Sequence, residues 1–180
     1  MTFARWFMLI IPSFLMEIVG RVLAPVLPLF ADKDGWLPRQ LWWFQTPDNS
    51  IDGDKGHRER WPGTSAWATY VRRVAWLLRN VAYGFHLDVL GVKVLESDYV
   101  AVCGDPKVGD QSGVSGWCRW RVFRHGKLIA WQFYFVWHYE IFGVWKCVRI
   151  GAGWKCWNEK PFTAQHWIYF HPCKGSGRQG

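Results

Sequence analysis

The sequence predicts an α+β fold, with apolar and amphipathic helices near the N-terminus and a C-terminal antiparallel β-meander. An apolar stretch runs from Trp6 to Phe30, and residues 67–94 carry apolar side chains at helical spacing. After Gly116, runs of β-branched and aromatic residues alternate with turn residues, which is typical of strands joined by hairpins. We expect a hydrophobic membrane-associating segment, a turn-rich acidic loop region, an amphipathic helix, a basic Trp-rich β region and a flexible tail, at residues 1–31, 32–66, 67–94, 95–173 and 174–180.

Length and composition bound the classes of protein that need to be considered. A chain of 180 residues fits one domain, or a membrane-proximal segment followed by a small domain. The 15 tryptophans suit protein cores, bilayer interfaces and nucleobase stacking equally well. The formal net charge of +8 resides in the C-terminal part. Such a basic region attracts the phosphates of lipid headgroups or nucleic acid, or it forms a solvated basic surface.

The N-terminal apolar segment is long enough to cross a bilayer, which takes about 20 residues. Its apolar run from Trp6 to Met16 is too short alone, so a spanning helix must carry Glu17 and Arg21 near its end. Arg5 resembles the start of a signal peptide, but no small-x-small cleavage site follows, so we expect retention. The alternatives to an anchor or span are a helix buried against the protein and an interfacial helix.

The segment 67–94 predicts one amphipathic helix that carries Arg72, Arg73 and Arg79 among its apolar residues. A basic, aromatic helix of this kind can lie on an anionic membrane with its arginines toward the phosphates. Alternatively, its apolar stripe faces the core of the protein itself, as in most globular proteins.

The acidic loop, residues 43–54, reads WFQTPDNSIDGD and combines many turn-forming residues. We expect Asp48, Asn49, Asp52 and Asp54 to hold the shape of this loop through hydrogen bonds to nearby backbone. We expect their task to be structural, fixing a loop between the membrane-proximal segment and the β region.

The same loop matches the spacing of an EF-hand calcium loop, with oxygen ligands at Asp48, Ser50, Asp52, Asp54 and Glu59. Pro47 and the sequence Trp61-Pro62-Gly63 deny the loop the paired helices of an EF-hand. Metal-dependent hydrolysis would need His57 beside one of these carboxylates, and no nucleophile elbow or H-E-x-x-H motif accompanies it. We therefore expect no enzyme and no cofactor, with Ca²⁺ as the alternative.

In the β region we expect strands at residues 117–123, 128–138, 142–150, 154–157 and 166–170. A turn at His125-Gly126 would pair Trp120 with Trp131 on an apolar core face. The opposite face would carry Arg119 and Arg121 among aromatic rings, a pattern that single-stranded nucleic-acid-binding sheets use, although no RNP signature is present. The same pattern arises when Arg and Trp side chains cover a small sheet against an N-terminal helix, which is the alternative.

The five cysteines contain no C-x-x-C pair and are expected to be mostly reduced, buried thiols. A hairpin turn at Gly151-Ala152 would place Cys147 opposite Cys156, either as a disulfide or as a small apolar pair.

Three islands resemble a family of small uncharacterised proteins of tailed bacteriophages and prophages: the acidic loop, Gly153-Trp154-Lys155, and the AQ…F…P run from Ala164 to Pro172. The resemblance implies a phage accessory protein with a hydrophobic N-terminus and no assigned site residue. We expect a non-enzymatic protein at the host cell membrane that acts through protein or envelope contacts, with a phage or host envelope protein as partner. The alternatives are a soluble, cytoplasmic module that binds single-stranded nucleic acid and, third, a metal-dependent hydrolase at the acidic loop.

Overall fold

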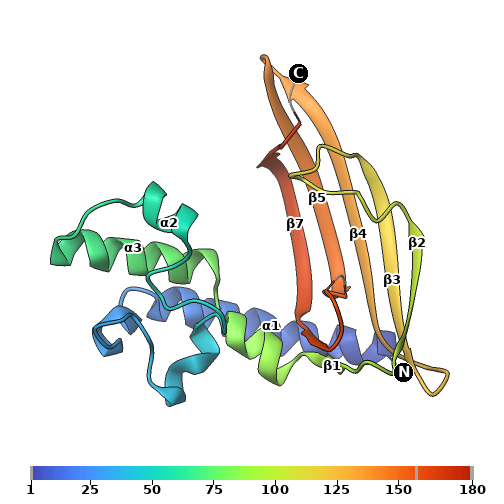
Figure 1. The fold of residues 1–180 in the computed structure, drawn as a ribbon, viewed down its shortest axis with the longest axis horizontal. Coiled ribbons are helices and arrows are strands. Elements are labelled where there is room, and N and C mark those ends of the chain that lie inside the picture. Colours follow the sequence, from blue (N-terminus) through green and yellow to red (C-terminus); the bar gives the residue numbers. More distant parts are fainter. Residues whose placement is uncertain (1, 157, 179–180) are drawn as a thin grey trace. The chain divides into compact units, whose positions relative to one another are not determined.

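The structure, a computed structural model, describes residues 2–156 and 158–178 and confirms the α+β class (Figure 1). The chain forms two compact units. Residues 9–90 make the helical unit, and residues 1–8 together with 91–180 make the sheet unit.

The helical elements begin with α1 (Thr2–Leu23), whose first residues belong to the sheet unit. The others are the 3-10 helices η1 (Leu27–Phe30) and η2 (Arg39–Phe44), α2 (Lys55–Arg60), α3 (Ala66–Arg79) and the π-helix η3 (Phe85–Val89). The core of the helical unit is formed by side chains from all along it: Ala24, Leu27, Leu37, Phe44, Ile51, Trp76, Leu77 and Ala82. Thus the region predicted as a loop contributes directly to a packed core.

The single helix predicted over 67–94 is wrong, because α3 ends at Arg79. Ser65 caps its start by accepting a hydrogen bond from the Ala68 amide at 3.2 Å, and Asn80 ends it. Beyond that point Ala82 has a φ of 48°, outside the range of a right-handed helix. The apolar spacing continues past the end of the helix because the later residues pack in the same core from a different element.

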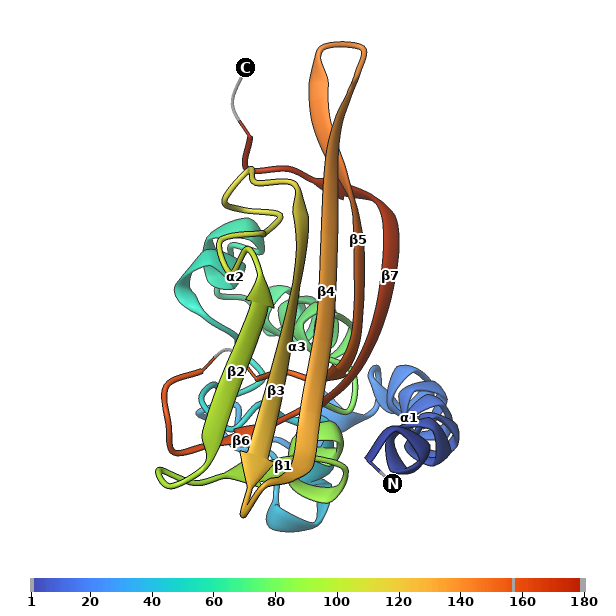
Figure 2. The same cartoon turned by 90° about the vertical axis from the view of Figure 1, so that its right-hand side faces the viewer.

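The sheet unit contains a five-stranded antiparallel sheet in the order β2-β3-β4-β5-β7 (Figure 2). Its strands are β2 (Tyr99–Gly104), β3 (Gly116–Arg124), β4 (Lys127–Ile141), β5 (Val144–Trp154) and β7 (His166–Gly175). A separate two-stranded sheet pairs β1 (Val92–Val94) with β6 (Phe162–Ala164). The meander was predicted, whereas β1, β2 and β6 were not.

The predicted pairing of Trp120 with Trp131 is wrong by one residue. The His125-Gly126 turn forms, with both φ angles positive, but the strand pairing shifts register between Val122 and Phe123, just before the turn. Trp120 therefore pairs with Gln132, and Arg119 and Arg121 share their face with Phe133 and Trp131 instead of Gln132 and Ala130.

The predicted turn at Gly151-Ala152 is also wrong, because β5 continues through both residues to Trp154. A Cβ at Gly151 would overlap the indole of Trp167, so glycine here lets that ring lie across the sheet. Cys147 and Cys156 are consequently not opposite each other, and both are buried free thiols. The strand predicted at 154–157 is absent from residues 155 and 156, and position 157 lies outside the described residues.

The tail predicted to be flexible from residue 174 is held as far as residue 178. Lys174 pairs with Asp110 at 2.7 Å, the Ser176 hydroxyl bonds the Nδ1 atom of His138 at 2.6 Å, and the Arg178 guanidinium lies over the Trp145 ring at 4.4 Å. Positions 179 and 180 lie outside the described residues.

Candidate functional site: the apolar helix α1 and the acidic loop

The exposed surface of α1 is almost entirely apolar. Phe7, Ile11, Phe14 and Val22 are between 62% and 70% exposed, and Ile18 is 44% exposed. By length and composition the helix can cross a membrane, a test that core helices and signal sequences also pass. A core helix is mostly buried, however, and only 11% of the most apolar window of α1 is buried.

The opposite side of α1 packs on the helical unit through small residues. The Ser13 hydroxyl bonds the Nε2 atom of the buried His86 at 3.2 Å. Gly20 is buried, and a Cβ there would come within 2.8 Å of the Val81 side chain, so glycine permits the close approach. At 100° per residue, Ser13 and Gly20 lie on one side of α1, across the helix axis from Ile11 and Ile18. One face therefore contacts protein and the other is a continuous apolar stripe.

The first turns of α1 are fixed within the sheet unit. The Trp6 indole donates a hydrogen bond to the Gly153 carbonyl at 3.1 Å, and the Thr2 hydroxyl donates to the Leu128 carbonyl at 2.6 Å. Phe3 packs on Trp131 with ring centroids 4.9 Å apart.

The only charges between residues 6 and 23 are Glu17 and Arg21, which pair at 3.3 Å as their spacing predicts. On the helical wheel they border the apolar stripe, so the pair leaves the centre of the stripe uncharged.

In the acidic loop, Asp52 is the partner of two arginines of α3. Arg73 donates from Nε to Oδ1 at 3.0 Å and from Nη2 to Oδ2 at 2.9 Å, and Arg72 donates to Oδ1 at 3.3 Å. Burial opposes ionisation of Asp52, but the hydrogen bonds and charges of Arg73 and Arg72 outweigh it and lower the pKa of the carboxyl. Both arginines, considered above for contact with an anionic membrane, are therefore engaged in holding the loop to α3.

The other loop residues have separate local tasks. Asp54 caps α2 by accepting a hydrogen bond from the His57 amide at 2.7 Å, and Thr46 donates to the Asn49 carbonyl at 3.0 Å. Asp48 is exposed, and Ser50 follows it at partial exposure. Glu59 lies on the surface, 3.9 Å from Lys55.

These positions do not form the calcium constellation that was considered as the alternative. Within residues 2–156 and 158–178, no three His, Cys, Asp or Glu side chains gather closely enough to hold a metal ion. The His57 ring bonds the Arg72 carbonyl at 2.9 Å and packs edge-on against Trp76, so it is a core residue and not the partner of a carboxylate.

The remaining candidate arginines lie on surfaces. Arg79 is half-exposed, 3.9 Å from Asp54 and over the Trp76 ring at 5.4 Å. Arg121 lies over Phe123 at 5.7 Å, and Arg119 is exposed. Their sheet face also carries a cross-strand row of Trp117, Phe135, Ile150 and Phe170. Phe170 is 70% exposed, so this face is more apolar than basic.

The sequence patterns did not reveal a cationic cluster on the other face of the sheet. Arg149 lies over the ring of Tyr169 at 4.5 Å and 3.5 Å from Asp110, which also binds Lys174. Burial, and then the charge of Arg149, lowers the pKa of Lys155 to about 8. Because side chains alternate between the two faces of a strand, the sequence could have suggested that Arg149 and Lys174 share one face of the sheet. It could not have indicated their partner Asp110, which comes from an irregular loop.

Comparison with known proteins identifies a family without a described activity. The model of a family of unknown function (DUF7338) matches residues 1–178. No curated protein and no solved structure gives a significant match.

Proposed function

This chain belongs to the family of unknown function DUF7338, and we propose that it is a non-enzymatic accessory protein held at a membrane by α1. The observation that carries the proposal is the apolar stripe, defined as Phe7, Ile11, Phe14, Leu15, Ile18 and Val22. All six residues are at least 44% exposed, and on the helical wheel they lie on the side of α1 away from Ser13 and Gly20.

We propose that α1 lies in the plane of the membrane and does not cross it. A spanning helix is surrounded by lipid or by other apolar helices, whereas one side of α1 is occupied by Ser13, His86 and Gly20 contacts of the helical unit. An interfacial helix needs only one apolar face and charged residues at its border, which Glu17 and Arg21 supply.

The apolar stripe is large enough to hold the protein on a bilayer. Burying one large apolar side chain contributes about 1.5 to 3 kcal/mol, and these six are roughly half to two-thirds exposed. Moving them into lipid therefore contributes on the order of 6 to 10 kcal/mol, before the cost of immobilising the protein. A single myristoyl chain binds with a constant of about 10⁴ M⁻¹, which corresponds to roughly 5.5 kcal/mol.

Contact with another protein completes the proposal. The apolar row on the sheet, with the exposed Trp117 and Phe170 at its ends, is the kind of surface that binds partners. The resemblance to phage and prophage proteins supports a proposed location at the host cell membrane, with a phage or host envelope protein as the proposed partner. Nucleic acid is a weaker candidate, since the sheet face of Arg119 and Arg121 also carries this apolar row.

The proposal is tested by expressing the protein in bacteria and floating the isolated membranes through a density gradient after a wash in 1 M salt. Ile11→Glu combined with Ile18→Glu places two charges at the centre of the apolar stripe. Val89→Glu combined with Leu95→Glu, at apolar residues that are 48% and 44% exposed outside α1, is the matched control.

We expect the wild type and the control to float and the α1 variant to stay in the soluble fraction. Hydrophobic insertion survives high salt, whereas attachment through exposed arginines is screened. Recovery of the wild type as a soluble monomer contradicts the proposal.

A further inference from the structure

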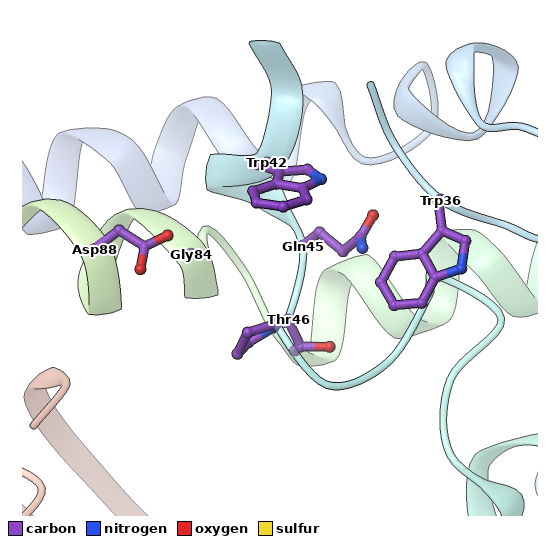
Figure 3. A pocket seen from close by; sticks show the side chains of 7 residues that line it. Trp36, Trp42, Gln45, Thr46, Gly84 and Asp88 are labelled. Carbon is purple, nitrogen blue, oxygen red and sulfur yellow. The ribbon is translucent and has the colours of Figure 1, made fainter. Parts of the chain in front are cut away.

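The helical unit contains a cavity of about 170 Å³ that the function above does not use (Figure 3). It lies beside the acidic loop and η2, and its lining is Trp36, Trp42, Gln45, Thr46, Pro47, Gly84 and Asp88. At about 30 Å³ per water molecule, it holds five or six waters or one small organic group.

The cavity is built by specific contacts and is not a gap in loose packing. The buried Gln45 side chain accepts a hydrogen bond from the Leu37 amide at 2.8 Å, which fixes one wall. Gly84 meets the carbonyls of Trp42 and Gln45 so closely that a Cβ there would lie 3.0 Å from the Gln45 oxygen. Only glycine allows η2 and the start of η3 to meet in this way.

The lining combines aromatic rings with one carboxylate. The indoles of Trp36 and Trp42 flank Gln45, and Asp88 extends from η3 toward the same space (Figure 3). Trp36 is 39% exposed and Trp42 is 53% exposed, so both rings stand at the mouth of the cavity. Asp88 is the only charged group in the lining, and within the described part of the chain its carboxylate makes no ion pair.

We propose that this cavity binds a small organic ammonium group, primary or quaternary. Indole faces attract cations that carry apolar substituents, and an unpaired carboxylate supplies the opposite charge. An anionic ligand would be repelled by Asp88, and a neutral one would gain nothing from it. Two sources offer this chemistry: free amines such as choline, and the headgroups of zwitterionic phospholipids.

The headgroup source rests on the proposed function, because it requires the protein to be at a membrane. Binding of a free ammonium compound does not. The two can therefore be tested separately, and the cavity can fail while membrane anchoring stands.

The first experiment titrates choline into the purified full-length protein in maltoside detergent, followed by calorimetry. The probe for charge is 3,3-dimethyl-1-butanol, the neutral carbon analogue of choline. The variants are Asp88→Asn and Trp42→Leu. Their matched controls are Glu59→Gln and Trp67→Leu, at a surface carboxylate and at a 73% exposed tryptophan of the same unit.

We expect saturable binding of choline and affinity for the neutral analogue at least tenfold lower. Each cavity variant should bind choline about three- to thirtyfold more weakly, and the controls should be unchanged. Asp88→Asn keeps the shape of the residue, so it reports on charge even if Trp42→Leu perturbs folding. The absence of saturable binding, or equal affinity for the neutral analogue, overturns the proposal.

The second experiment distinguishes the sources by flotation with vesicles of phosphatidylglycerol alone or mixed with phosphatidylethanolamine. A headgroup ligand predicts tighter binding to the mixed vesicles, and Trp42→Leu should abolish that increment. If wild type and Trp42→Leu bind both vesicles equally while choline still binds the wild type, the ligand is a free ammonium compound.

Discussion

Replacing Asp52 by asparagine is expected to destabilise the helical unit strongly, because it leaves two arginines without their shared counter-ion. The side chains of Arg72 and Arg73 are only 13% and 12% exposed, and that of Asp52 is 19% exposed. Removing one partner of a fully buried ion pair costs about 3 to 5 kcal/mol. Because these three groups retain some contact with water, we expect about 2 to 4 kcal/mol.

Thermal and urea unfolding measure this loss. For a chain of this length, each kcal/mol shifts the Tm by about 2 to 4 °C, so Asp52→Asn should lower it by roughly 4 to 16 °C. The same loss should appear with calcium and with chelator. Asp48→Asn, at an exposed residue of the same loop, is the control and should change the free energy of unfolding by less than about 0.5 kcal/mol. A Tm within 2 °C of the wild type for Asp52→Asn, or calcium stabilisation that this substitution removes, would refute the reasoning.

Two further predictions concern the sheet unit. Gly151→Ala should destabilise it by about 1 to 3 kcal/mol in urea unfolding, because the new methyl group overlaps the Trp167 ring; an unchanged midpoint would show that the ring moves freely. Hydrogen bonds from Arg124 outweigh burial and lower the pKa of Asp98 to about 2 from 3.8. A lowered folded-state pKa gives stability that is complete above the unfolded-state pKa and lost on acidification, so about 1 to 2 kcal/mol should vanish between pH 5 and pH 2. In Asp98→Asn, the free energy of unfolding should not show this loss between pH 5 and pH 2. If the free energy of unfolding depended on pH identically in both proteins, the lowered pKa of Asp98 would be contradicted.

The sequence was sufficient to predict features that depend only on residues close together in the chain. The His125-Gly126 turn and the Glu17–Arg21 pair follow from residue types and short spacing, and both form. The α+β class followed from periodicity in the same way. The shift between Val122 and Phe123 could not be predicted, because it depends on how the two strands twist together and not on a turn residue.

Predictions from sequence patterns were wrong where a residue interacts with a partner that is distant in the sequence. Arg72 and Arg73 resembled the basic face of a surface helix, but their partner Asp52 lies about 20 residues earlier. The calcium spacing was misleading for the same reason, since Asp52 turns to α3 and Asp54 turns to α2. The Gly151-Ala152 turn failed because the glycine serves the packing of a ring on the neighbouring strand.

The cavity beside η2 was also beyond prediction. Trp36, Trp42 and Asp88 come from three segments, and the close contact of Gly84 with the carbonyls of Trp42 and Gln45 brings η3 beside η2. The sequence predicts an ordered acidic loop. It does not predict that Gln45 and Thr46 of this loop line a cavity, because the other walls come from distant parts of the chain.

Flotation of the purified protein with lipid vesicles in 1 M salt tests the central claim most directly, because it isolates α1 from every cellular partner. We predict that the wild type floats with the vesicles and that Ile11→Glu with Ile18→Glu remains at the bottom as a folded monomer with the wild-type circular dichroism spectrum. If the wild type remained at the bottom as a monomer, or if the α1 variant floated equally well, the apolar stripe would not be a membrane anchor.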